Sequence, residues 1–321
     1  MEVGEFVGTK IVLNVVQVLV VLLCAPLIKG VIKRWKAVFQ RRRGPSIWQP
    51  YYDLWKLFRK GSVIPEDASW IFRLAPYVYF AAPLVVALLI PVLTTFPLFM
   101  AFMGDMLGGG FVLGLGGFFL LLAALDTGSA FGGMGANRSR FVAFLAEPVL
   151  MLVFFTVSFV AGSTIPYIVN QTLARPDLLL HPSHLLAAIA LFMVILAEAG
   201  RIPVDNPDSH QELSMIDESR ILEFSGRELA LVEWGAAMKF FVLLTILLNV
   251  LVTPWGLSPD AAWHHVLGAV AVLLGKMLVA AFVIVLIESS YAKLRLLRVA
   301  EFLGAAFVLA LLAVVSYTLG G

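Results

Sequence analysis

Carboxylates are concentrated in one short part of this chain. Nine of its 21 acidic residues lie between Glu198 and Glu233, and apolar runs long enough to cross a bilayer flank that stretch. A carboxylate at a membrane boundary is costly to desolvate unless it is paired, hydrated or used in function. The sequence therefore predicts a functional site here, whose chemistry would be a change of protonation or of ion pairing.

Three further ionisable residues lie well inside the later apolar runs. Lys239 and Lys276 are too far from the predicted span ends for their ammonium groups to reach water easily, so each is expected to face the bundle interior or a hydrated path. Glu147 has two interpretations. It is either a buried acid satisfied by Arg138, Arg140 or a backbone group, or a member of a proton relay.

Other kinds of site find little support. Asp208, His210 and Glu212 lack a second histidine and a helical i, i+4 pair, so no metal site is predicted. The glycine-rich segment 128–135 lacks the Gly-Lys-Ser/Thr ending of a phosphate loop. Because Cys24 is the single cysteine, the chain can hold no cysteine-ligated cluster. A haem or iron–sulfur centre would therefore belong to a partner.

The elements that must position these residues are membrane-spanning helices. Hydrophobic residues make up 60% of the 321 residues, charged residues make up 14%, and the mean hydropathy is +0.94. This composition is typical of an all-α polytopic membrane protein, here read as a single integral membrane domain over residues 1–321. Eight apolar runs are candidate spans, at about 8–32, 76–103, 111–128, 141–165, 185–200, 229–252, 262–287 and 299–319.

The acidic stretch itself is not predicted to be helical throughout. Pro203 and Pro207 interrupt any helix, so the fifth span is expected to end near Arg201. Irregular backbone at membrane depth persists only where protein covers it or water fills a cavity. We therefore expect a coupling loop over residues 198–228, covered by a cytoplasmic subunit.

Basic residues give the orientation. The connection after the first span holds 11 of the 23 Lys and Arg residues, and the connections after spans three, five and seven hold eight more. Basic connections face the cytoplasm, so both termini are predicted to lie on the outer side of the cytoplasmic (inner) membrane.

Residues 41–60 are predicted to form a short amphipathic helix on the cytoplasmic face. Aromatic residues such as Trp48 and Tyr52 follow the basic run Arg41, Arg42 and Arg43, which a Gly-Pro turn ends. The segment either anchors the chain at lipid headgroups or docks a cytoplasmic partner. Nucleic-acid binding is not expected, since anionic lipid already explains the basic residues.

Several segments together resemble a known family. They are RRRGPSIWQPYYDLWKL, FRLAPYV, LDTGSAFGGMGANRSR with AEP, AEAGRIPVDNPDSHQEL, LEFSG and ESSYAKLRLLRVAEFLG, in that order between Arg41 and Gly304. They look like the respiratory complex I subunit that carries the quinone chamber, the NuoH or subunit 1 family. The resemblance is closer to the corresponding subunit of membrane-bound energy-converting [NiFe] hydrogenases and formate hydrogenlyases.

The resemblance implies a cofactor-free subunit of an oxidoreductase complex, which is not catalytic by itself. Its expected partners are the hydrogenase large and small subunits, which would hold the [NiFe] centre and iron–sulfur clusters, antiporter-like membrane subunits, and the lipid bilayer. The positions carried over include the charged loop residues. The candidate ion-coupling residues are Asp126, Glu147, Glu198, Arg201, Asp205, Glu212, Glu218, Glu223, Lys239 and Lys276, and the candidate partner-docking residues are Arg41, Arg42, Arg43, Trp48, Tyr52 and Arg138.

The expected function is to anchor a cytoplasmic redox module and to couple its turnover to proton or sodium translocation. Two alternatives remain open. The first is the quinone-chamber subunit of a complex I-like NADH or ferredoxin:quinone oxidoreductase, which requires an open chamber roofed by residues 41–60. The second is a stand-alone ion transporter, which requires a substrate site at mid-membrane.

Overall fold

The computed structural model describes residues 2–175, 181–207 and 214–320. Its elements are helical throughout the described residues. The helices are α1 (Glu2–Phe39), α2 (Gln49–Phe58), α3 (Trp70–Leu89), α4 (Met106–Asp126), α5 (Ala130–Ala161), α6 (Pro166–Leu173), α8 (Pro182–Glu198), α9 (Gly226–Ile246), α10 (Trp263–Ser290) and α11 (Leu296–Gly320). Two short 3₁₀ helices, η1 (Ala101–Met103) and η2 (Glu218–Ile221), and a π-helical turn, η3 (Leu247–Val252), complete the described elements.

The all-α membrane architecture is confirmed. Seven of the described helices are long and apolar enough to cross a membrane, and α8, with 17 residues, is a shorter apolar helix at the place of the fifth predicted span. The second predicted span, 76–103, differs from the structure because α3 already ends at Leu89. Ile90 is extended and precedes Pro91, and the residue before a proline is disfavoured in a helix.

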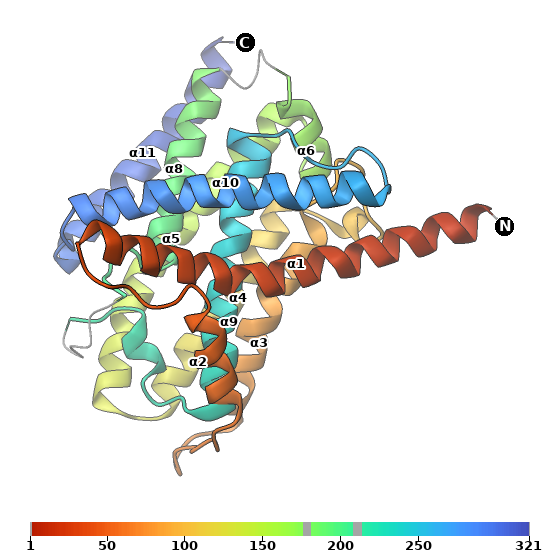
Figure 1. Ribbon diagram of the computed structural model, residues 1–321. Helices are drawn as coiled ribbons and strands as arrows, with labels where there is room; N and C mark the ends of the chain where they lie inside the picture. The colour runs from red at the N-terminus through yellow and green to blue at the C-terminus, as the bar shows by residue number, and fades with distance from the viewer. Residues whose placement is uncertain (1, 176–180, 208–213, 321) are drawn as a thin grey trace.

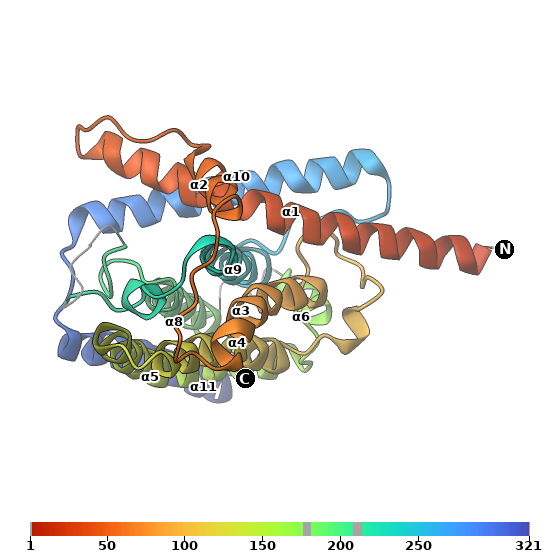
Figure 2. The same cartoon turned by 90° about the horizontal axis from the view of Figure 1, so that it is seen from below.

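The helix axes run in two main directions. In Figure 1, α3, α4, α5, α8, α9 and α11 run alongside one another, whereas α1 and α10 lie across them as a pair. Figure 2, seen from below, shows α1 and α10 on one side of the molecule and α3, α4, α5 and α11 on the other. Helix α9 runs between these layers, and nearly all of its side chains from Val232 onward are buried or half-buried. It is therefore the axis of the bundle.

Helix α2 is attached to α1 through carbonyl groups near a proline. Pro26 lies inside α1 and has no N–H, so the carbonyl of Leu22 lacks its usual helical partner. The indole Nε1 of Trp234 on α9 donates to this carbonyl at 2.9 Å, and the hydroxyl of Tyr51 on α2 donates to the carbonyl of Leu23. The predicted short helix in 41–60 is thus present as α2, and it packs beside α9.

Candidate functional site

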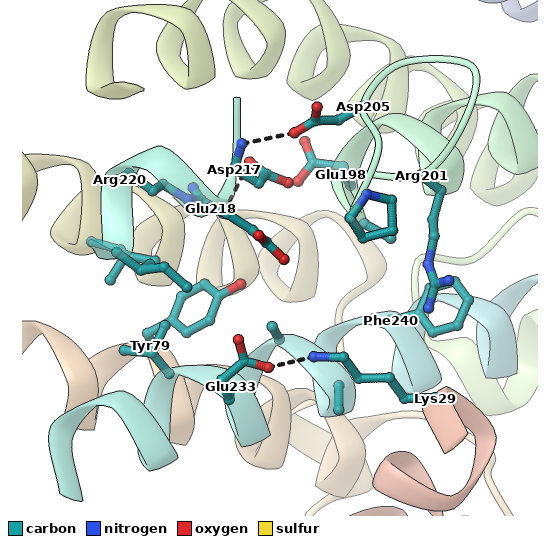
Figure 3. Close-up of a pocket in the computed structure, with 18 of the residues that line it drawn as sticks. Lys29, Tyr79, Glu198, Arg201, Asp205, Asp217, Glu218, Arg220, Glu233 and Phe240 are labelled. Carbon is teal, nitrogen blue, oxygen red and sulfur yellow. Dashed lines mark hydrogen bonds and ion pairs between the residues drawn. The ribbon is translucent and has the colours of Figure 1, made fainter. Parts of the chain in front are cut away.

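A cavity of about 140 Å³ lies where α1, α3 and α9 meet the acidic loop. Lys29 of α1 and Glu233 of α9 form an ion pair in its wall. Figure 3 shows the carboxylate of Glu218 and the hydroxyl of Tyr79 pointing towards the same space as Glu233. This first cavity therefore brings together two carboxylates, an ammonium and a phenol from four different elements.

Glu218 is the titratable residue of the first cavity whose protonation changes near neutral pH. Burial raises the pKa of its carboxyl from 4.5 to about 7, and the nearby charge of Glu233 acts in the same direction. The cationic side chains of Lys29 and Lys33 lower it less. A carboxyl in this range can gain or lose a proton when a neighbouring charge changes.

Two charge pairs meet the first cavity through Glu198, Asp217 and Arg220. Lys239 Nζ lies 2.5 Å from Glu198 Oε2, and Arg220 Nη2 lies 3.3 Å from Asp217 Oδ1. The side chains of Glu198 and Lys239 are each only 10% exposed. Because burial of an unpaired charge is costly, each partner of this pair offsets the desolvation of the other.

The same two pairs also border a second, larger cavity. This space of about 930 Å³ lies between α4 and α5, and its lining is mostly apolar. Glu198, Asp217 and Arg220 line both cavities, and Lys239 and Glu147 line the second. Residues of the two charge pairs thus border both spaces.

Glu147 lies within α5, on its exposed face along the second cavity. A Cβ added to Gly114 of α4 would lie 3.5 Å from its carboxylate, so the glycine leaves room for the acid. Within the described residues no ion pair joins Glu147 to Arg138 or Arg140. The interpretation as an acid neutralised by either arginine therefore finds no support in the structure.

The acidic loop is held in place by backbone contacts to Asp205. This buried carboxylate accepts hydrogen bonds from the amides of Ile216 and Asp217, both at 3.0 Å, and pairs with Lys293 Nζ at 2.6 Å. Gly200 has a positive φ of +56°, and a Cβ there would lie 2.5 Å from an oxygen of Asp217. The loop backbone is irregular in its described part, as the prolines predict.

Arg201 fixes the start of the loop to the α1–α10 pair. Its Nη1 lies 3.2 Å from Glu288 Oε1, Lys36 Nζ lies 3.2 Å from Oε2 of the same carboxylate, and the guanidinium lies over the ring of Phe240. The Glu288 side chain has no exposed surface. Arg201 and Asp205 therefore position the loop, and they line the first cavity with charges that are already paired.

The remaining predicted residues lie apart from this cluster. Asp126 accepts a hydrogen bond from the amide of Ser69 at 2.7 Å, and Glu223 follows η2; neither lines either cavity. Glu212 lies outside the described residues. Lys276 is close to the far end of α9, where it contacts three oxygens.

The predicted docking residues fall into two groups. Arg41, Arg42, Arg43, Trp48 and Tyr52 are exposed. Arg138 is half-buried and donates a hydrogen bond to the carbonyl of Met215 at 3.1 Å, so it helps to hold the acidic loop on α5. Arg138 therefore differs from the five exposed residues, because it contacts another part of the same chain.

Sequence reasoning missed several residues of the cluster. Lys29 was counted only with the basic connection after the first span, although it lies within α1, which continues to Phe39. Tyr79, Asp217 and Arg220 gave no sequence signal of their own. The only available indication was that Asp217 and Arg220 lie three residues apart within the acidic stretch.

Comparison with known proteins establishes the family. A family model described as NADH dehydrogenase matches residues 11–319. The chain belongs to this family. Its relatives include Hydrogenase-4 component C of Escherichia coli K12, which is 33% identical over 98% of this chain and 98% of that relative. Formate hydrogenlyase subunit 4 of the same organism is 34% identical over 94% of this chain and 96% of that relative.

Two further proteins are similar, one in sequence and one in fold. A subunit of the NADH-quinone oxidoreductase of Rickettsia prowazekii is 29% identical over 64% of this chain and 62% of that relative. A chain of the membrane-bound sulfane sulfur reductase, an archaeal respiratory membrane complex, has the same fold, with a TM-score of 0.82 and 21% identity over 95% of this chain and 98% of that chain. The resemblance found in the sequence motifs is confirmed: this is a multi-pass membrane protein whose relatives are subunits of oxidoreductase complexes.

Proposed function

We propose that this chain is the membrane-anchoring and ion-coupling subunit of a membrane-bound [NiFe] hydrogenase complex. The two hydrogenase-type relatives match almost its whole length, whereas the quinone-reductase relative matches about two thirds of it. The redox chemistry would occur in cytoplasmic partner subunits that hold the [NiFe] centre and the iron–sulfur clusters. This chain would link that chemistry to proton or sodium translocation.

The observation that carries the proposal is that the two cavities share charged residues. Glu198, Asp217 and Arg220 line both spaces, so a change on one side acts on the same charges that border the other. When redox turnover changes the charge near the acidic loop, the protonation of Glu218 near neutral pH responds first. Its charge then alters the balance between Glu198 and Lys239, and that change reaches Glu147.

The direction of this relay is sideways rather than through the bundle. From Phe240 to Val252 the central helix carries no ionisable side chain. At about 1.5 Å per residue, this segment is roughly 20 Å long. The acids instead lead from the first cavity to the space between α4 and α5. An antiporter-like membrane subunit would therefore receive the signal at the α4–α5 face, while the hydrogenase large and small subunits would cover the loop and α2.

The proposed orientation follows the basic residues. The acidic loop and α2 would face the cytoplasm, and both termini would lie on the outer side of the inner membrane. In this orientation the exposed Trp48 and Tyr52 lie where a cytoplasmic partner or lipid headgroups can reach them.

The packing of α2 supports the hydrogenase function over a quinone-binding one. A quinone chamber needs open space between α1, α2 and α9, but Trp234 and Tyr51 both bond to carbonyls of α1 there. The ring of Phe58 on α2 lies 6.1 Å from that of Trp234. The first cavity, of about 140 Å³, is smaller than the few hundred Å³ of an ordinary small-molecule site, and the second cavity, of about 930 Å³, has no lining residue from α2.

The experiment compares two activities of the purified complex containing Glu198→Gln. Hydrogen turnover is measured with an artificial electron carrier, and ion uptake is measured after reconstitution into vesicles. The variant leaves Lys239 without its partner, so less complex should assemble. In the complex that assembles we expect turnover to be retained and ion uptake per hydrogen to fall several-fold, because glutamine keeps the shape of the Glu198 side chain but removes its charge. Glu66→Gln, an exposed acid before α3, is the matched control and should change neither activity.

A parallel loss of both activities in an assembled Glu198→Gln complex would contradict the coupling role. It would show that Glu198 serves catalysis in the partner. Quinone-dependent turnover by the purified complex would instead favour the quinone-chamber alternative.

A further inference from the structure

The C-terminal end of α9 is built differently from an ordinary helix end. The helix changes to the π-helical turn η3 at Leu247, and regular helix stops at Val252. The amide and hydroxyl of Thr253 both donate to the carbonyl of Leu248, at 2.7 and 2.9 Å. The backbone carbonyls after this point accept no hydrogen bond within the helix, so they need donors from elsewhere.

Lys276 supplies those donors from the middle of α10. Its Nζ lies 3.0 Å from Asn249 Oδ1, 2.7 Å from the carbonyl of Thr253 and 2.5 Å from the carbonyl of Trp255. An ammonium has three N–H groups, so these three oxygens satisfy it completely. In the described part of the chain no carboxylate forms an ion pair with it.

The three oxygens are held in place by contacts that do not involve Lys276. The amide nitrogen of Asn249 donates to the carbonyls of Pro91 and Val92, at 3.1 and 3.0 Å, and this orients its Oδ1 towards Lys276. Asn170 Nδ2 donates to the carbonyl of Asn249 at 2.6 Å. Asn249 and Asn170 are each only 1% exposed, so this frame is part of the packed interior.

The segment after α9 is also held close to α10. Gly256 has a positive φ of +82°, and a Cβ there would lie 2.6 Å from Cγ1 of Val272, one helical turn before Lys276. Only a glycine permits this approach without strain. The carbonyls of Thr253 and Trp255 are therefore positioned by the fold of the segment itself.

Neutral carbonyl and amide oxygens at the unwound end of a membrane helix are the ligands that replace water around Na⁺ and K⁺, and the C-terminal end of a helix favours positive charge. We propose that Asn249 Oδ1 and the carbonyls of Thr253 and Trp255 form a site for a small monovalent cation, and that the ammonium of Lys276 is the cation that fills it. The lysine thereby keeps free ions out of this end of α9. Removal of the ammonium opens the site to Na⁺, K⁺ or methylammonium.

The test uses the purified complex with Lys276→Ala, which removes the ammonium and leaves room for a free cation. The measurement is the temperature at which the complex loses its subunits, with added methylammonium, NaCl or KCl. Choline chloride, whose cation is too bulky for the site, controls for ionic strength. Lys60→Met, an exposed lysine after α2, controls for the loss of one positive charge.

We expect Lys276→Ala to lower this temperature by at least about 3 °C, and methylammonium or one of the metal ions to restore it with saturable concentration dependence. Choline should restore nothing, and the Lys60→Met complex should respond to none of the salts. Lys276→Met, whose side chain fills the space of the lysine stem, should be destabilised without being restored. Equal responses of the Ala and Met variants to all salts would overturn the proposal.

A second variant decides the question if Lys276→Ala does not assemble. Lys276→Gln retains two hydrogen-bond donors without the charge. We expect its complex to be less stable than the native one, because the site is made for a cation. A Lys276→Gln complex as stable as the native complex would show that the oxygens need only donors and would contradict the proposal.

Discussion

The central helix α9 has polar contacts at two places, at Lys239 and at its C-terminal end, where Lys276 of α10 binds. The two places differ in the kind of group that pairs with the lysine. At Lys239 the partner is the carboxylate of Glu198, and cavities lie on both sides of the pair. Further along the chain, Lys276 meets the end of the same helix through Asn249 and two backbone carbonyls. At the first place carboxylates can change their protonation and pairing, whereas the oxygens at the second are neutral amide and carbonyl groups.

This difference assigns different work to the two places. A relay needs groups whose charge responds to a neighbour, and the acids around Lys239 are of that kind. A site that keeps free ions out needs groups whose charge does not respond to a neighbour, and amide and carbonyl oxygens meet that requirement. The two places are separated by the stretch Phe240 to Val252 of the central helix, which carries no ionisable side chain.

The largest expected effect comes from Lys239→Met, which leaves Glu198 buried without its partner. Breaking a buried ion pair in this way destabilises a protein by about 3–5 kcal/mol, so we expect much less assembled complex and a lower temperature of subunit loss. The double variant Lys239→Met with Glu198→Met should regain most of that stability, because two apolar side chains replace both charges. A single variant as stable as the native chain would show that the pair is not desolvated as the structure indicates.

A smaller effect is expected at the other place from Asn249→Leu. The carbonyls of Pro91 and Val92 lose their donor and Lys276 loses one acceptor, which should lower stability by about 1–3 kcal/mol. Thr245→Val on the same helix is the matched control, since its hydroxyl bonds only to the carbonyl of Phe241 within α9. Thermal unfolding of the two variants side by side measures the difference. Equal effects would mean that the Asn249 contacts do not hold the end of α9.

The smallest expected effect is a pH dependence that belongs to Glu218. Its pKa is about 7 in the folded chain and 4.5 in the ordinary state, so the folded protein retains a proton that the unfolded chain releases between these values. The stability of the native complex relative to Glu218→Gln should therefore fall as pH rises through this window and level off above it. Unfolding temperatures of both complexes from about pH 5 to about pH 8 test this. A difference that stays constant over the range would place Glu218 in water rather than in the cavity.

Local sequence features predicted the membrane class, the acidic loop and α2, because each depends on residues close together in the chain. Apolar runs indicated the spans, Pro203 and Pro207 indicated irregular backbone, and the Gly-Pro turn preceded the short helix. The boundaries were less accurate. Helix α1 continues to Phe39 and α3 ends at Leu89, because tertiary contacts and the proline that follows set these ends.

The amino-acid sequence by itself determined that Lys239, Lys276 and Glu147 require polar surroundings, since charge inside an apolar run is costly wherever the chain folds. Only the tertiary structure decided which surroundings they have. Lys239 meets Glu198, 41 residues away, and Lys29 meets Glu233, 204 residues away. Lys276 meets the oxygens of Asn249, Thr253 and Trp255 instead of an acid. The partners of Lys29 and Lys276 come from the way α1 and α10 lie across α9, and the partner of Lys239 comes from the packing of α8 against α9. No local pattern in the sequence encodes these contacts.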